Sequence, residues 1–204
     1  MRKTFLTFAA ILFILNQVNV YALAPWHGDR HFEELHNEVL LLLKSGVKLK
    51  ILFVDDEFAD ERWAGDSCKK LKGMGFIPGA EIEFAESGSE GIEKARRFRP
   101  DIVITDLNME RANSGFRLAS EIAKEFPHIS IVIASTDRPM QREMERYKRE
   151  GIITGWSLSK PSDENETLKL LMLAGTGLVS KGNIPAAEAL RIESSITLEP
   201  EESL

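Results

Sequence analysis

The chain has 204 residues, of which 43% are hydrophobic and 28% are charged, and its formal net charge is -6. This balance suits one globular domain with extensions and argues against a fibrous or wholly disordered chain. The acidic net charge gives no electrostatic signature of nucleic-acid binding. The single cysteine, Cys68, excludes an intrachain disulfide bond and a cysteine-based zinc site.

The first 24 residues have the pattern of an export signal. Basic residues precede an apolar run from Phe5 to Leu15, and small residues follow at Ala22 and Ala24. This pattern is typical of a secretory signal peptide, and the run is short for a membrane span. Residues 1–24 are therefore expected to be a signal peptide or an apolar N-terminal segment.

A short amphipathic helix is expected within residues 25–47. Apolar residues recur at helical spacing from Phe32 to Leu43, and Gly46 ends the pattern. The apolar face of such a helix needs a cover, so we expect this lead-in helix to pack on the main domain or on a partner.

Five short apolar segments follow, and each has the length of a buried strand. They span residues 50–54, 81–85, 102–106, 129–134 and 152–158. Their apolar residues are continuous rather than alternating, which is typical of parallel strands that are buried on both faces.

Helical patterns separate these strands. Helices are expected over residues 61–71, 87–98, 116–126, 138–150 and 164–173. Strands that alternate with helices predict an α/β domain whose parallel sheet is covered on both faces, here over residues 48–174. Residues 175–204 are richer in Gly, Ser, Pro and Glu, and we expect an acidic, flexible tail there.

Carboxylates follow two of the predicted strands. Asp55 and Asp56 come directly after the first strand, and Asp106 ends the third. Parallel strands share one carboxyl edge, where ligands bind, so neighbouring strands would bring these side chains together. The carboxylates would repel one another without a cation, and oxygen ligands with room for water favour Mg²⁺. Glu57 is expected at the rim of the pocket, without a ligand role.

Two further polar residues are predicted at the same edge. Ser135 ends the fourth strand with a hydroxyl group, and Lys160 follows the fifth strand with an ammonium group. A metal ion, a hydroxyl group and an ammonium group around one carboxylate can hold a phosphoryl group. In the structural alternative, the paired aspartates only cap a helix and Lys160 is an exposed lysine.

Four segments, taken together, resemble the receiver domains of two-component response regulators: ILFVDDE, RPDIVITDLNM, FPHISIVIAST and SKP. They occur in the order of that family and close to its spacing. The resemblance implies a flavodoxin-like, doubly wound fold with a five-stranded parallel sheet and helices on both faces. It also implies that a histidine kinase or a histidine phosphotransfer protein phosphorylates one aspartate.

The resemblance also implies a role for each residue of the predicted pocket. Asp106 is the phosphoacceptor, Ser135 contacts the phosphoryl oxygen and relays the switch, and Lys160 pairs with the phosphorylated aspartate. The implied Mg²⁺ ligands are Asp55, Asp56, Asp106 and the backbone carbonyl group of Asn108.

The expected function is that of a stand-alone response regulator, not an enzyme, that signals by protein contact through residues 138–173. No direct nucleic-acid binding is expected. Two alternatives stay open: a binding module that works without phosphorylation, and a Mg²⁺-dependent phosphohydrolase with Asp106 as nucleophile.

Because phosphoryl donors of this family depend on ATP, we expect a cytoplasmic protein, membrane-associated if residues 5–24 bind lipid. Export is the alternative if residues 1–24 are a true signal peptide.

Several positions depart from the family pattern. Glu110 replaces a usual proline, and the segment before Lys160 carries an insertion that we place at Thr154 and Gly155. Ser157 replaces the usual switch aromatic, with Trp156 beside it. These departures leave the expected chemistry intact and leave the output mechanism open. Thr136 is a rival to Ser135 for the role of hydroxyl group.

Overall fold

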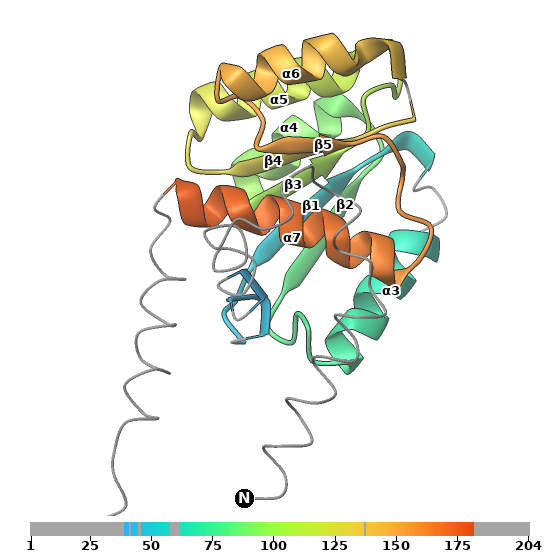
Figure 1. Ribbon diagram of the computed structural model, residues 1–204, viewed down its shortest axis with the longest axis vertical. Helices are drawn as coiled ribbons and strands as arrows, with labels where there is room; N and C mark the ends of the chain where they lie inside the picture. The colour runs from blue at the N-terminus through green and yellow to red at the C-terminus, as the bar shows by residue number, and fades with distance from the viewer. Residues whose placement is uncertain (1–38, 41, 45, 58–61, 137, 182–204) are drawn as a thin grey trace, which may run out of the picture. The chain divides into compact units, whose positions relative to one another are not determined.

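The computed structural model describes residues 39–40, 42–44, 46–57, 62–136 and 138–181. In these ranges one parallel sheet is formed by β1 (Lys50–Val54), β2 (Glu81–Ala85), β3 (Ile102–Thr105), β4 (Ser130–Ala134) and β5 (Gly155–Ser157). The strand order is β2-β1-β3-β4-β5, so the order reverses between β1 and β3 (Figure 1). Four of the predicted strands are confirmed to within one residue at either end.

Helices connect the strands across both faces of the sheet. In chain order, the described residues form α3 (Arg62–Gly73), α4 (Gly88–Phe98), α5 (Ser114–Glu125), the 3-10 turn η3 (Arg138–Met140), α6 (Gln141–Arg149) and α7 (Glu164–Ser180). α4, α5 and α6 cover one face, and α3 and α7 cover the other (Figure 1). The predicted flavodoxin-like, doubly wound α/β fold is thereby confirmed.

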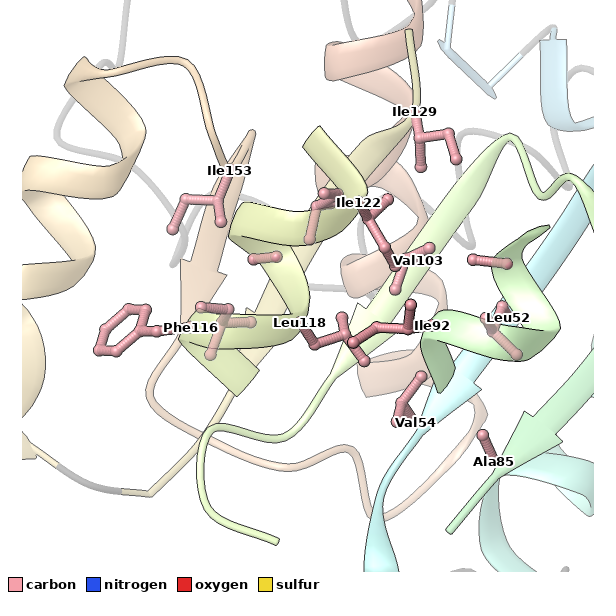
Figure 2. Close-up of a cluster of buried hydrophobic side chains, with 14 of the residues drawn as sticks. Leu52, Val54, Ala85, Ile92, Val103, Phe116, Leu118, Ile122, Ile129 and Ile153 are labelled. Atoms are coloured by element: carbon pink, nitrogen blue, oxygen red, sulfur yellow. The ribbon is translucent and has the colours of Figure 1, made fainter. Parts of the chain in front are cut away.

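The hydrophobic core lies on both faces because neighbouring side chains of a strand point in opposite directions. Towards α4, α5 and α6, a buried cluster joins Leu52 and Val103 of the sheet to Ile92 and Leu118 of the helices (Figure 2). Phe53 points to the other face, where its ring stacks on a neighbouring phenylalanine of β2. This burial holds the strands, and hence their carboxyl ends, in one register.

β5 is shorter than the predicted strand over residues 152–158. The chain turns at Gly151, which has a φ of 72°, and the N–H groups of Ile152 and Ile153 both donate to the carbonyl oxygen of Tyr147. These residues therefore complete the C-terminal cap of α6 before the chain can reach the sheet.

α7 is longer than the predicted helix over residues 164–173, and it continues to Ser180. A Cβ atom at Gly175 would collide with Val39, and one at Gly177 would collide with the hydroxyl group of Thr154. The two glycines therefore permit close packing of α7 instead of ending it. The expectation of a flexible tail from residue 175 is wrong up to the end of α7, and its remainder lies outside the described residues.

The structure describes only the C-terminal part of the expected lead-in helix. Residues 39, 40 and 42–44 are helical, the side chains of Val39, Leu42 and Leu43 are buried, and Gly46 has a positive φ of 75°. Val39 lies against Gly175 of α7, so this segment packs on the main domain. Packing on a partner was the other possibility. Residues 1–38 lie outside the described residues. No helix in the described part of the chain is long and apolar enough to cross a membrane.

Candidate functional site

Asp55 and Asp106 lie side by side at the point where the strand order reverses. β1 and β3 are paired so that Val54 is opposite Thr105, and the next residue of each strand is the aspartate. The backbone N–H of Asp106 donates to the carbonyl oxygen of Val54 at 2.8 Å, which extends the ladder by one residue. Their side chains are only about 5% exposed. The sheet thus fixes two buried carboxylates at the place where ligands bind in this fold.

A third carboxylate completes the cluster. Asp55, Asp56 and Asp106 each offer one oxygen atom, and these atoms lie within 4.8 Å of one another. Asp56 is exposed, so the cluster opens to solvent. Hard oxygen ligands that leave several positions for water fit Mg²⁺. The structure therefore brings the three predicted carboxylate ligands together.

Lys160 reaches into this cluster from the segment after β5. Its Nζ atom lies 3.2 Å from carboxylate oxygens of both Asp55 and Asp106. It lies 2.9 Å from Oε2 of Glu57, the shortest of its ion pairs. The structure therefore places Lys160 at the edge that carries the predicted carboxylates. The contact with Glu57 is not predicted from sequence, because it depends on the rotamer of an exposed side chain.

Burial and charge set the protonation of the pocket. Burial raises the pKa of Asp55 and the pKa of Asp106 above the usual value for aspartate, although Lys160 opposes this shift. Burial lowers the pKa of Lys160, but its ion pairs with Glu57, Asp55 and Asp106 outweigh that effect and raise the pKa overall. One ammonium group is thus shared by several carboxylates, and a divalent cation would relieve the remaining repulsion.

Ser135 lies at the same carboxyl edge, directly after β4. Its backbone N–H donates to the carbonyl oxygen of Ser157 at 3.0 Å, and the residue is 3% exposed. Thr136, the rival hydroxyl group, is exposed. The structure therefore places Ser135 inside the protein at the edge that carries the aspartates.

The loop after β3 is held by contacts that the sequence patterns do not reveal. A carboxylate oxygen of Glu110 accepts the backbone N–H of Gly88, the first residue of α4, at 3.1 Å. A Cβ atom at Gly115 would collide with the backbone of Asp106, and the side-chain oxygen of Asn108 accepts the N–H of Asn113 at 2.8 Å. These contacts fix the backbone that leads away from the candidate phosphoacceptor.

Trp156 of β5 faces the layer formed by α4, α5 and α6. Trp156 is partly buried against the core cluster below α4, α5 and α6, and the Nζ atom of Lys148 lies 5.6 Å from the centre of its ring. The hydroxyl group of Ser157 lies 3.1 Å from that of Ser159. That Trp156 takes the role of the switch aromatic, whose usual position is occupied by Ser157, remains a prediction.

Comparisons with known proteins agree with this geometry. The chain matches the response regulator receiver domain over residues 51–172. It is 32% identical over 129 residues to Protein PilH of Pseudomonas aeruginosa, a match that covers 62% of this chain and 98% of PilH.

Solved structures of receiver domains are also similar to the chain. The chemotaxis response regulator CheY4 of Vibrio cholerae is 25% identical, with a TM-score of 0.50, and the match covers 63% of this chain and 99% of CheY4. A response regulator receiver domain protein from Clostridium thermocellum is 24% identical, with a TM-score of 0.50, over 67% of this chain and 98% of that one. With the family match over more than half of its residues, the chain belongs to the response regulator receiver domain family.

Proposed function

We propose that the protein is a phosphoacceptor of a two-component phosphorelay and that Asp106 receives the phosphoryl group. The observation that carries this proposal is the position of Asp106, which is buried beside Asp55 and lies 3.2 Å from the ammonium group of Lys160. A carboxylate so placed is a nucleophile with a positive charge in reach of the group that it would receive.

The proposed chemistry is an in-line transfer to the carboxylate. A bond forms between an oxygen of Asp106 and phosphorus, while the bond from phosphorus to the donor breaks and its electron pair leaves with the donor. Lys160 neutralises charge on the transferring group, and Ser135 donates a hydrogen bond to a phosphoryl oxygen.

The acidic pocket fits the Mg²⁺ that receiver domains bind. The ligands proposed here are Asp55, Asp56, Asp106 and the backbone carbonyl group of Asn108. When bound, the ion supplies positive charge to the phosphoryl oxygens. The donor oxygens of the three carboxylates are close enough to share one ion.

The proposed phosphoryl donor is a histidine kinase or a histidine phosphotransfer protein, and the proposed output is a protein contact through residues 138–173. That segment contains α6, β5 and the start of α7. Tyr147 of α6 stacks on Phe116 of α5 with ring centres 4.3 Å apart. The α5 helix begins at the end of the loop that follows Asp106, so this stack supports a path from the pocket to α6.

Beryllium fluoride, which mimics a phosphoryl group on aspartate, tests the proposal. With Mg²⁺ present, we expect it to shift the NMR signal of the Leu107 amide, whose N–H donates to Oδ1 of Asp106 at 2.7 Å. Asp106→Asn is the matched control and is expected to show no such shift. No shift in the wild-type chain, or an equal shift in the control, contradicts phosphoacceptance and favours the binding module. Turnover of phosphate esters would favour the phosphohydrolase.

A further inference from the structure

Lys160 is shared between the candidate phosphoacceptor and a carboxylate outside the candidate metal cluster. Its Nζ atom lies 2.9 Å from Oε2 of Glu57 and 3.2 Å from Asp55 and Asp106. The Glu57 side chain is 68% exposed, whereas the two aspartates are buried. Glu57 therefore contacts the ammonium group at the exposed rim of the pocket, whereas the two aspartates contact it in the buried part.

A hydrogen bond fixes the backbone of Glu57 beside the cluster. The N–H of Glu57 donates to Oδ1 of Asp55 at 3.0 Å, so the residue is tied to the strand end that carries the cluster. Its carboxylate does not belong to the group of oxygen atoms within 4.8 Å that could share a metal ion, which consists of Asp55, Asp56 and Asp106. A cation in the cluster would attract the carboxylates of the aspartates and weaken their interaction with Lys160. Glu57 would then be the carboxylate that still pairs with Lys160.

A phosphoryl group on Asp106 needs the same ammonium group. The group brings further negative charge and acceptor oxygens next to Lys160, and Glu57 already occupies one of the three donors that a lysine offers. The phosphoryl group can therefore gain the full charge of Lys160 only by displacing Glu57.

We propose that Glu57 is a positioning residue that competes with the phosphoryl group for Lys160 and thereby weakens its binding at Asp106. This inference rests on the proposed function of Asp106. Because Glu57 is mostly exposed, water weakens its interaction with Lys160, and the effect on affinity is expected to be about threefold.

Glu57→Gln removes the negative charge of Glu57 and keeps the shape of its side chain. The inference predicts opposite changes in the two binding affinities of this variant. At saturating Mg²⁺, the variant binds beryllium fluoride about threefold more tightly than the wild-type chain, because Lys160 is released. Without beryllium fluoride, it binds Mg²⁺ more weakly, because the pocket has lost negative charge and Lys160 can turn to the aspartates. Titrations followed by the NMR signal of the Leu107 amide measure both affinities.

Two controls separate competition for Lys160 from a general change in charge. Glu86→Gln removes an exposed carboxylate that also follows a strand, but among the described residues Lys160 pairs with Asp55, Glu57 and Asp106 and not with Glu86. It is expected to leave the affinity for beryllium fluoride nearly unchanged. In a Lys160→Met background, Glu57→Gln is expected to give no gain in that affinity.

The outcomes distinguish this inference from the proposed function. A wild-type chain that responds to beryllium fluoride, with equal or weaker binding in Glu57→Gln, would overturn the competition alone. An equal gain in the Lys160→Met background would overturn it as well. No response in the wild-type chain would overturn both the competition and the assignment of Asp106.

Discussion

The carboxyl edge of the sheet and the C-terminal end of α7 are held by different kinds of interaction. At the edge, the carboxylates that follow β1 and β3 meet around Lys160, which follows β5. At the end of α7, Gly175 and Gly177 let the helix backbone approach the lead-in helix, the start of β4 at Ser130, and Thr154, the residue before β5. The edge depends on the chemistry of a few side chains, and the helix end depends on shape.

This difference predicts opposite responses to substitution. A carboxyl group at the edge can be replaced by an amide of the same shape with little loss of packing, but its charge is lost. A methyl group added or removed at the helix end changes packing and leaves the pocket untouched. The four substitutions below test this contrast, from the largest expected effect to the smallest.

Leu42→Ala is expected to have the largest effect. The side chain of Leu42 is completely buried, and its truncation should lower the free energy of unfolding by about 3 kcal/mol through lost burial and a cavity. Urea denaturation measures the change. Met74→Ala is the control, because Met74 is 53% exposed and its truncation should be nearly neutral. A neutral Leu42→Ala would show that the lead-in helix is not part of the domain core.

Gly177→Ala is expected to lower the free energy of unfolding by about 2 kcal/mol. The added methyl group would collide with the hydroxyl groups of Ser130 and Thr154, which lie 2.9 Å apart. The Ser130 hydroxyl also donates to the carbonyl oxygen of Ala174 at 2.6 Å, and that buried bond would be disturbed. Thermal unfolding tests whether the variant is less stable than the wild-type chain.

Gly73→Ala is the matched control for this packing test. A Cβ atom there has no other atom within 4 Å, so alanine should stabilise α3 by up to about 1 kcal/mol. Equal effects of the two substitutions would mean that helix propensity, and not close packing, governs the end of α7.

Asp106→Asn is expected to raise the free energy of unfolding by about 1 kcal/mol in the absence of Mg²⁺ at neutral pH. Burial raises the pKa of Asp106 in the folded chain, so the charged carboxylate destabilises the fold above that pKa. The penalty should fade as the pH falls towards the pKa of the unfolded chain, where the carboxyl group is protonated in both states. Asp66→Asn, at an exposed position, is the control in urea denaturation and should change the free energy of unfolding by less.

Glu110→Gln is expected to have the smallest effect, a loss of about 0.5 kcal/mol in the free energy of unfolding. The Glu110 carboxylate accepts the N–H of Gly88 at the start of α4, where a negative charge interacts favourably with the helix dipole. Glu93→Gln, within α4, is the control and should change stability less. A neutral result at Glu110 would show that solvent screens this contact completely.

The fold and most of the pocket can be predicted from the sequence because local patterns determine them. Continuous apolar segments mark buried parallel strands, and the residue after such a strand must lie at the carboxyl edge. Asp55, Asp106 and Ser135 follow their strands directly, so their place needs no knowledge of the loops. Lys160 follows less directly, because residues 158 and 159 separate it from β5. Its place at the edge is predicted from its position after the fifth strand, and its role relies on the resemblance to the family.

The remaining features depend on contacts between distant parts of the chain. Glu57 and Lys160 are 103 residues apart, and their pairing depends on the conformation of two long side chains. The length of α7 depends on Val39, which lies on another helix. The glycines near the end of α7 suggest a helix end when only local propensity is considered. The predictions for residues 1–38 lie outside the described residues and stay predictions.

α7 joins the two regions compared here. The helix begins shortly after Lys160 and, at 1.5 Å per residue, is about 25 Å long. Near its far end, Gly175 lies against Val39 of the lead-in helix. A rotation of α7 by a few degrees about its start would displace its far end by about 1 to 2 Å at this length. The length of the helix would thus turn a small rotation near Lys160 into a displacement of atomic size at the segment that precedes the sheet.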